Sequence, residues 1–214
     1  MQVVAINGSH RKGKNTAMML QNVLDELEKH GVRAKLVELA DYNLNFCLGC
    51  NSCLSQNNCQ IDDDMKKISD ILIKANGIIL GSPVYWENVT TRMKNFMDRT
   101  RFLHMKKNML AGKVGAAVTF AGLRNGGQEF CLNVMENFLK SHGLILADTR
   151  NMDHTLINVG AMGTMQKDYD GNSIMWHKTV KNDLIALGAC KQLGKNILQL
   201  LKILNCERCY SVST

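Results

Sequence analysis

Residues 2–16 are Gln2-Val3-Val4-Ala5-Ile6-Asn7-Gly8-Ser9-His10-Arg11-Lys12-Gly13-Lys14-Asn15-Thr16. The apolar start predicts a buried strand, and residues 15–30 continue with apolar side chains at helical spacing. The turn between them holds two glycines, which permit tight backbone turns, and it ends at a helix N-terminus, which carries partial positive charge. This order of strand, turn and helix predicts an α/β fold with an anion-binding loop after its first strand.

The loop itself predicts binding of a phosphate group. It matches neither the P-loop pattern nor the dinucleotide-binding glycine pattern. Its length and hydroxyl side chains suit a terminal monophosphate such as that of FMN, whereas a solvated, lysine-rich turn is the alternative interpretation. The side chains predicted to bind are Ser9, Arg11, Lys12, Lys14, Asn15 and Thr16.

The rest of the chain alternates short apolar runs with helical patterns. Strands are predicted at residues 2–7, 34–39, 77–81, 114–120 and 144–149, and helices at 15–30, 63–75, 90–103, 127–142 and 177–204. The alternation implies a parallel sheet with helices on both faces, and five strands favour the flavodoxin-like doubly wound order 2-1-3-4-5. We expect one α/β domain over residues 1–214, with an irregular insertion at 150–176 as a candidate oligomerisation arm or lid.

A net charge of +7 and eight cysteines narrow the functional class. Lysines are dispersed and aromatic residues are few, which argues against nucleic-acid binding, while a positive surface suits a phosphorylated cofactor or an acidic protein partner. No apolar run approaches the roughly 18 residues of a membrane span, and the first residues lack signal-peptide features. We therefore expect a cytoplasmic protein without membrane contact, whose cysteines are reduced or bind metal.

Two further loops follow predicted strands and should lie at the same edge of the sheet as the phosphate loop. The loop after residues 77–81 offers aromatic faces for a flat ring, and the loop after 114–120 is rich in glycine, so its backbone can approach a ring edge. Taken alone, Tyr85 and Trp86 also fit core or interface aromatics. Together the loops predict a flavin, in contact with Ser82, Pro83, Val84, Tyr85, Trp86, Asn88, Gly122, Arg124, Asn125, Gly126, Gly127 and Glu129.

A compact cysteine motif with the spacing C-x2-C-x2-C-x5-C lies within residues 42–62. Cys47, Cys50, Cys53 and Cys59 are predicted to bind one [4Fe–4S] cluster, because four thiolates this close together can wrap one metal centre. Structural zinc is a second interpretation, although zinc sites usually join two C-x2-C pairs through a longer spacer. The other thiols are interpreted as core residues or as an incidental pair: Cys131 and Cys190, and Cys206 and Cys209.

The motifs together resemble a known family. Three groups of residues are similar to the FMN sites of the NAD(P)H-dependent FMN reductase superfamily: Gly8-Ser9 with Arg11, Asn15 and Thr16; Ser82-Pro83-Val84-Tyr85; and Asn125-Gly126-Gly127-Gln128-Glu129. The cysteine motif resembles that of the iron–sulfur flavoproteins in that superfamily. The resemblance implies one FMN and one [4Fe–4S] cluster per subunit. It also implies a homodimer or a dimer of dimers, in which the cluster of one subunit serves the FMN of its neighbour.

These expectations amount to a redox function. We expect electrons to pass from a low-potential carrier such as an acidic ferredoxin through the cluster to FMN, and on to an acceptor for which the resemblance suggests dioxygen or hydrogen peroxide. No side chain is predicted as a general acid or base, because the cofactors supply the chemistry. Two alternatives stay open: a cluster-free NAD(P)H-dependent FMN or quinone reductase, whose relatives keep several of these cysteines, and a flavodoxin-like carrier with structural zinc.

Overall fold

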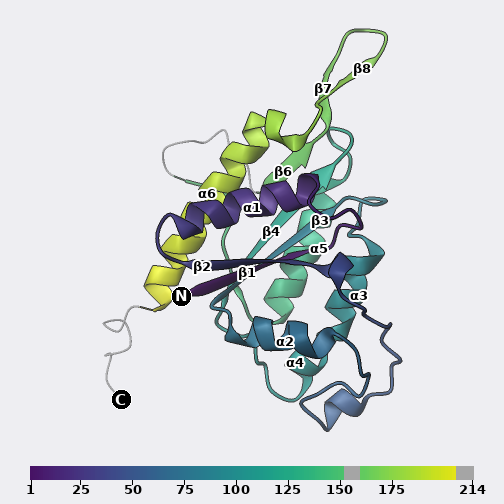
Figure 1. The fold of residues 1–214 in the computed structure, drawn as a ribbon, viewed down its shortest axis with the longest axis vertical. Helices are drawn as coiled ribbons and strands as arrows, with labels where there is room; N and C mark the ends of the chain where they lie inside the picture. Colours follow the sequence, from purple (N-terminus) through teal and green to yellow (C-terminus); the bar gives the residue numbers. More distant parts are fainter. Residues whose placement is uncertain (152–159, 206–214) are drawn as a thin grey trace.

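The computed structural model describes residues 1–151 and 160–205, which fold around one central sheet (Figure 1). Five strands follow the order β2-β1-β3-β4-β5, and a sixth, β6, pairs with β4. All of these pairs are parallel. The predicted flavodoxin-like order is therefore confirmed. The strands of the five-strand path are β1 (Gln2–Asn7), β2 (Arg33–Glu38), β3 (Gly77–Pro83), β4 (Val114–Ala121) and β5 (Ile145–Leu146).

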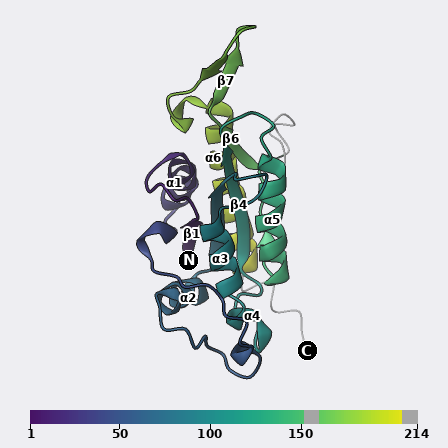
Figure 2. The same ribbon diagram turned by 90° about the vertical axis from the view of Figure 1, so that its right-hand side faces the viewer.

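Helices cover both faces of this sheet (Figure 2). One face packs against α1 (Asn15–Glu28) and α6 (Leu184–Leu204), and the other packs against α2 (Met65–Lys74), α3 (Thr91–Arg99) and α5 (Gln128–Ser141). Because β3 and β4 are covered on both sides, every residue in them is buried, as is typical of central parallel strands. The apolar positions predicted for the first helix are all buried: Met19, Leu20, Val23, Leu24 and Leu27.

The two helices on the first face cross at close range. A Cβ atom at Gly194 would lie 2.9 Å from the Cβ of Glu26 and 3.0 Å from the carbonyl oxygen of Val23. A glycine at this point of α6 therefore sets the distance between α6 and α1. Among the described residues, no helix is both long enough and apolar enough to cross a membrane.

The edge of the sheet differs from the sequence expectation. The strand predicted at 144–149 is short, and its place beside β4 is completed by β6 (Ala161–Thr164), which pairs with Val118 to Ala121. Two further strands, β7 (Gln166–Tyr169) and β8 (Ile174–Trp176), form an antiparallel hairpin that extends from the body at the top of Figure 1. The insertion expected to be irregular thus contains three strands, which are too short to show a period. Residues 152–159, within the same insertion, lie outside the described part.

Two predicted helices also differ at their ends. The helix predicted at 90–103 is interrupted after Arg99, and a short helix α4 (Phe102–Met105) follows. The closing helix begins at Leu184 rather than near 177, because Asp183 caps it: one carboxylate oxygen accepts from the backbone N–H of Ala186 (3.1 Å). The other oxygen accepts from the backbone N–H of Thr164 (3.0 Å), so the same residue fixes the start of α6 against β6.

Candidate functional site

Three loops lie at the edge of the sheet where the parallel strands end. Residues 8–14 join β1 to α1, residues 84–90 join β3 to α3, and residues 122–127 join β4 to α5. The structure places the predicted flavin-binding residues on these loops or in the adjoining turns of strand and helix: Ser9, Arg11, Lys12, Lys14, Asn15, Thr16, Ser82, Pro83, Val84, Tyr85, Trp86, Asn88, Gly122, Arg124, Asn125, Gly126, Gly127 and Glu129.

The first two loops contact each other directly. Thr90, the N-cap of α3, donates its hydroxyl hydrogen to the carbonyl oxygen of Gly8 (2.6 Å) in a buried hydrogen bond. Farther out, the rings of His10 and Tyr85 lie with their centroids 5.8 Å apart. These contacts hold the predicted phosphate loop beside the predicted ring-binding loop.

The phosphate loop is braced by hydrogen bonds of its own and by the neighbouring strand. Asn7 accepts from the backbone N–H of Ser9 (3.0 Å), and the hydroxyl of Ser9 accepts from the backbone N–H of Arg11 (3.1 Å). The carboxylate of Glu38, at the end of β2, accepts from the amide of Asn7 (2.6 Å) and from the backbone N–H of Gly13 (3.0 Å). Sequence reasoning missed Glu38, because its role depends on the pairing of β2 with β1.

The N-terminus of α1 is open to an anion. Lys14 occupies the N-cap without a side-chain hydrogen bond, and the first turn holds no acidic residue. This chemistry fits a phosphate, which binds the free N–H groups and the positive end of the helix dipole. Asn15 instead accepts from the backbone N–H of Val180 (3.1 Å). Lys12 forms an ion pair with Asp41, and this hydrogen bond raises the pKa of the lysine ammonium.

The second loop contains an unusual turn. Tyr85 and Asn88 exchange two backbone hydrogen bonds (2.9 and 3.0 Å), and the residues between them, Trp86 and Glu87, have φ values of 52° and 59°. Both central positions of such a turn normally take Asn or Gly, and a larger residue there costs on the order of 1–3 kcal/mol. The turn leaves the Trp86 side chain fully exposed and that of Tyr85 half-exposed, so both aromatic rings are available to a ligand.

The third loop touches the second where only glycine fits. Gly127 has a φ of 90°, and a Cβ atom added to it would lie 2.7 Å from the Cα of Glu87. Gln128 then closes the loop: its Oε1 accepts from the backbone N–H of Gly126 (2.7 Å), and its Nε2 donates to the carbonyl oxygen of Leu123 (2.9 Å). The backbone of this loop is therefore held close to the second loop.

The start of β7 is attached to the same loop. The side chain of Gln166 accepts from the backbone N–H of Arg124 (2.9 Å), and its backbone N–H donates to the carbonyl oxygen of Gly122 (2.9 Å). Thr164 donates its hydroxyl hydrogen to the same carbonyl (3.2 Å). The hairpin thus begins at the predicted flavin site.

Most of the cysteine loop (residues 42–62) lies at the end of the molecule opposite the hairpin (Figures 1 and 2), but Leu44 and Phe46 near its start line a small pocket together with His10 of the first loop. Apart from a single 3-10 turn at Ser52–Leu54, residues 42–62 hold no regular structure. Cys47 and Cys50 are exposed, Cys53 and Cys59 are half-buried, and all four line one small cavity. The six described cysteines are free thiols. Four thiols around one cavity fit the thiolate ligation of an iron–sulfur cluster.

A metal site for a single ion is not formed by these side chains. Within residues 1–151 and 160–205, no three His, Cys, Asp or Glu side chains are arranged to hold one metal ion. The two cysteines predicted for the core, Cys131 and Cys190, are buried as expected, and burial raises the pKa of the Cys131 thiol to about 12. The pair Cys206 and Cys209 lies outside the described residues.

A buried arginine joins the two ends of the cysteine loop. Arg99 is 1% exposed, and its Nη1 donates to the carbonyl oxygen of Asn45 (2.6 Å) and to Asp63 (2.5 Å). Its Nη2 donates to Asp63 (2.9 Å) and to the sulfur of Cys59 (3.6 Å). Burial opposes ionisation of Asp63, but the hydrogen bonds from Arg99 and from backbone amides outweigh it and lower the pKa of that carboxyl.

A second arginine reaches the middle of the loop. Arg101 donates through Nη1 to the side-chain oxygen of Asn51 (2.8 Å) and to the sulfur of Cys53 (3.4 Å). The sulfur of Cys50 lies 3.2 Å from the hydroxyl of Ser52. That hydrogen bond, with a smaller contribution from the charge of Arg101, lowers the pKa of the Cys50 thiol.

Sequence reasoning missed both arginines. Arg99 is the last residue of α3 and Arg101 lies in the short connection to α4, 40 and 48 residues beyond the cysteines that they contact. Nothing in that stretch marks them as partners of thiols. The acidic run before α2 was visible. Asp63 accepts from the backbone N–H of Met65 (3.0 Å), as an N-terminal acidic residue should, but its pairing with Arg99 could only be seen in the structure.

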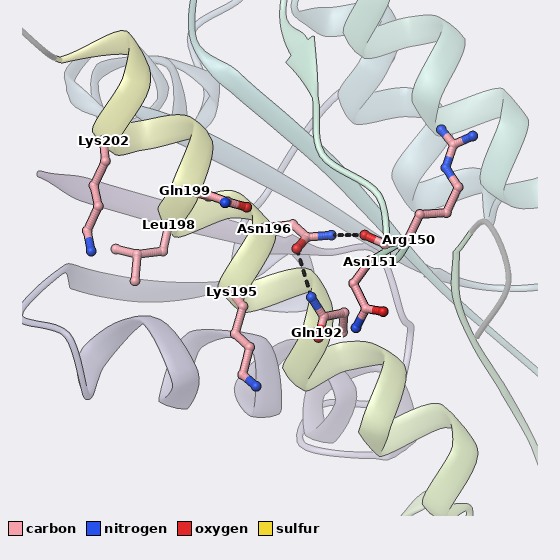
Figure 3. Close-up of a pocket in the computed structure, with 8 residues that line it drawn as sticks. All are labelled: Arg150, Asn151, Gln192, Lys195, Asn196, Leu198, Gln199 and Lys202. Atoms are coloured by element: carbon pink, nitrogen blue, oxygen red, sulfur yellow. Dashed lines mark hydrogen bonds between the residues drawn. The ribbon is translucent and has the colours of Figure 1, made fainter. Parts of the chain in front are cut away.

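A separate cavity of about 860 Å³ lies along the outer side of α6 (Figure 3). Asn196 forms part of one wall of this cavity, and its side-chain Nδ2 donates to the carbonyl oxygens of Asp148 and Arg150 (2.7 Å each). The cavity belongs to neither the three loops nor the cysteine loop, so it adds nothing to the candidate redox site. Its lining residues are Arg150, Asn151, Gln192, Lys195, Asn196, Leu198, Gln199 and Lys202.

Comparisons with known proteins agree with this geometry. The model of a family described as NADPH-dependent FMN reductase matches residues 1–155. An iron–sulfur flavoprotein of Methanocaldococcus jannaschii is 34% identical over 204 residues, which are 95% of this chain and 99% of that protein.

Solved structures show the same fold at low sequence identity. RosB with bound 8-demethyl-8-formylriboflavin-5'-phosphate superposes with a TM-score of 0.72 at 12% identity, over 95% of this chain and 80% of that one. A flavodoxin from the domain Archaea gives a TM-score of 0.56 at 20% identity, over 94% of this chain and 99% of that one.

Proposed function

Because the chain belongs to the NADPH-dependent FMN reductase family, and within it to the iron–sulfur flavoproteins, we propose that it carries electrons through a [4Fe–4S] cluster at Cys47, Cys50, Cys53 and Cys59 to FMN at the three loops. Membership makes it a flavin-dependent oxidoreductase or electron-transfer protein. The observation that supports the two-centre proposal best is that one chain carries two separate donor sets, an open helix N-terminus among three loops and four thiols around one cavity.

Each loop has a distinct task in holding FMN. The free N–H groups at the start of α1 and the hydroxyls of Ser9 and Thr16 would bind the phosphate, while Arg11 adds positive charge. Tyr85 and Trp86 would cover the ring and exclude water, and the backbone around Gly127 would reach the ring edge. When bound, FMN takes up one or two electrons and the cluster one at a time, so the pair connects a one-electron donor to a two-electron acceptor.

The proposed donor is a reduced ferredoxin or a similar acidic carrier. The chain has a net charge of +7, and opposite charge accelerates encounter in a way that weakens as salt screens it. We expect the rate at which reduced ferredoxin reduces the protein to fall steadily as ionic strength rises in an anaerobic stopped-flow experiment. A rate that does not depend on salt would remove the electrostatic argument. Dioxygen and hydrogen peroxide are the proposed acceptors.

We also propose that the protein assembles as a homodimer or a dimer of dimers, so that the cysteine loop of one subunit meets the FMN of another. Large apolar side chains are exposed on the cysteine loop, where Phe46 is 74% and Leu48 76% exposed, and on the hairpin, where Trp176 is 52% exposed. Removing residues 166–176 should reduce the number of subunits per particle, as calculated from the mass measured by light scattering. An unchanged number of subunits would rule out the hairpin as the contact.

A cluster-free reductase is the second candidate function, because the matching family is described by its use of NADPH. The two functions separate in one anaerobic titration followed by absorbance. Our proposal expects reduced ferredoxin to bleach both the flavin bands and a broad shoulder near roughly 400 nm, which is typical of thiolate-bound iron–sulfur centres. Rapid bleaching by NADPH of a spectrum with flavin bands alone would favour the second candidate.

A further inference from the structure

We propose that two arginines support the cysteine site in different ways: Arg99, neutralised by Asp63, fixes the shape of the cysteine loop, whereas Arg101, which keeps its charge, makes a cluster bound there easier to reduce. The inference rests on the proposed function, because it takes a [4Fe–4S] cluster as the ligand of the four cysteines. Both are positioning residues that act on thiolates.

Arg99 has the contacts of a structural clasp. It binds Asn45, two residues before the first cysteine, and Cys59 and Asp63 at the far end of the loop. Its side chain and that of Asp63 are both 0% exposed, so the two opposite charges neutralise each other within the protein. Its Nε has no hydrogen-bond partner among the described residues. Burying a guanidinium costs solvation free energy. Its position beside the cavity of the cysteines indicates that this cost is offset by a role in holding the loop ends in place.

Arg101 has the contacts of a free charge. Its hydrogen-bond partners are the neutral side-chain oxygen of Asn51 (2.8 Å) and the sulfur of Cys53 (3.4 Å). It pairs with no carboxylate in the part of the chain that the structure describes. The acidic residue that lines the cavity, Asp98, forms an ion pair with Lys94 (2.5 Å). Arg101 therefore presents an uncompensated positive charge to the thiolates.

The electrostatic consequence has a definite sign. Reduction by the ferredoxin-type donor adds one electron, and hence one negative charge, at the cysteines. A nearby cation and an N–H group pointing at a sulfur both stabilise the more negative state, and such groups are among those that set cluster potentials. Arg101 should thus raise the midpoint potential of the cluster. Arg99 should contribute less to the potential, because Asp63 cancels most of its charge.

The test for Arg101 uses anaerobically purified full-length protein and a potentiometric titration. Arg101→Gln should keep its iron and its FMN, and its cluster midpoint should shift to a more negative potential, while Arg101→Lys should restore most of the shift. Arg33→Gln is the matched control, since it removes one exposed positive charge at the start of β2. An unchanged cluster potential in Arg101→Gln with full iron would overturn the role given to Arg101.

The test for Arg99 avoids leaving one buried charge alone. The double variant Arg99→Gln with Asp63→Asn keeps the pair neutral. It should retain FMN, but it should hold iron against a chelator about ten- to a hundredfold less well. Losses of this size are usual when a residue that hydrogen-bonds to a metal ligand is removed. In the cluster-free protein, the same variant should be cut faster by protease within residues 42–62. Iron retention and cleavage equal to wild type would refute the clasp. Wild-type protein without iron would instead contradict the proposed function itself.

Discussion

The flavin edge and the cysteine loop are built on opposite principles. At the flavin edge, three loops leave the ends of buried strands and lock together through backbone contacts, such as the bond from Thr90 to Gly8 and the close approach of Gly127 to Glu87. The cysteine loop has almost no regular structure and is held at its ends by the side chain of Arg99.

The difference shows which site depends on the fold and which depends on its ligand. The sheet would place the three loops together in any sequence that keeps the strand order, because parallel strands end at one edge. The cysteine loop has no such scaffold, so side-chain hydrogen bonds and the proposed cluster would define its shape, as metal ligands define many small metal sites. The two sites should therefore fail independently.

Among the tests of this independence, Cys53→Ala should have the largest effect. The variant should lose essentially all of its iron, because one of the four proposed cluster ligands is gone. It should keep FMN, since Cys53 contacts Arg101 and the cysteine cavity rather than the three loops. Metal analysis and flavin absorbance of the same anaerobic sample provide the measurement. Equal loss of FMN and iron would mean that the two sites are not separable.

The reciprocal test is Gly127→Ala at the flavin edge. The new Cβ would lie 2.7 Å from the Cα of Glu87 at a positive φ, so strain and overpacking should lower stability by about 3 kcal/mol and expel FMN. Iron content should not change. Gly171→Ala is the matched control, because its φ is +96° but no atom lies within 4 Å. If both variants bind FMN equally well, the close loop contact is not what shapes the site.

A smaller effect on stability is expected at acid pH, and it arises at His142, whose partner Thr100 lies between the two arginines in the sequence. His142 Nε2 lies 3.0 Å from the hydroxyl of Thr100, which itself donates to the carbonyl oxygen of Met97 (2.7 Å). The hydroxyl therefore accepts from Nε2–H, which leaves Nδ1 unprotonated and without a partner among the described residues. Burial, and then the charge of His104, lowers the pKa of His142 to about 4.

The sign of the acid effect follows from this pKa. Between pH 6.5 and about 4 the unfolded chain binds a proton at His142 that the folded protein refuses, so stability falls as pH falls. At pH 5 the loss should be about 2 kcal/mol relative to neutral pH. Urea unfolding of wild type and His142→Gln at both pH values measures it. A pH dependence that is the same in both proteins would contradict the role of His142.

The smallest effect is expected from Lys12→Gln. The sequence predicts Lys12 as a phosphate ligand, but the structure pairs it with Asp41, and both side chains are about half exposed. An exposed ion pair contributes little to stability, and we propose that backbone N–H groups carry most of the phosphate site. FMN affinity, followed by fluorescence quenching, should change less than about fivefold. A much larger loss would show that charge, rather than the open helix end, holds the phosphate.

Sequence patterns predict the scaffold well because periodicity reports which side chains face the core. The helix from Asn15 and the unbroken apolar strand from Gly77 are both present. The same patterns fail for β6, whose four residues include a glycine and show no alternation. They also place Trp86 in a binding loop without revealing the strained turn that exposes it.

The cysteine site likewise has one part that the sequence predicts and one part that it does not. The spacing of Cys47, Cys50, Cys53 and Cys59 is local and can be found by inspection, and the structure places all four around one cavity. Arg99 and Arg101 are brought to the thiols only by the packing of α3 and α4, so no local pattern marks them. Side chains that act across distant elements are therefore the part of the site that needed a structure.

The most direct measurement is the content of iron, acid-labile sulfide, zinc and FMN in one sample purified without air. Two separate donor sets on one chain predict about one FMN together with about four iron and four sulfide per chain, and no stoichiometric zinc. FMN with neither iron nor sulfide would contradict the account, because the cysteine loop would then lack the ligand that the thiols and the arginines are proposed to hold.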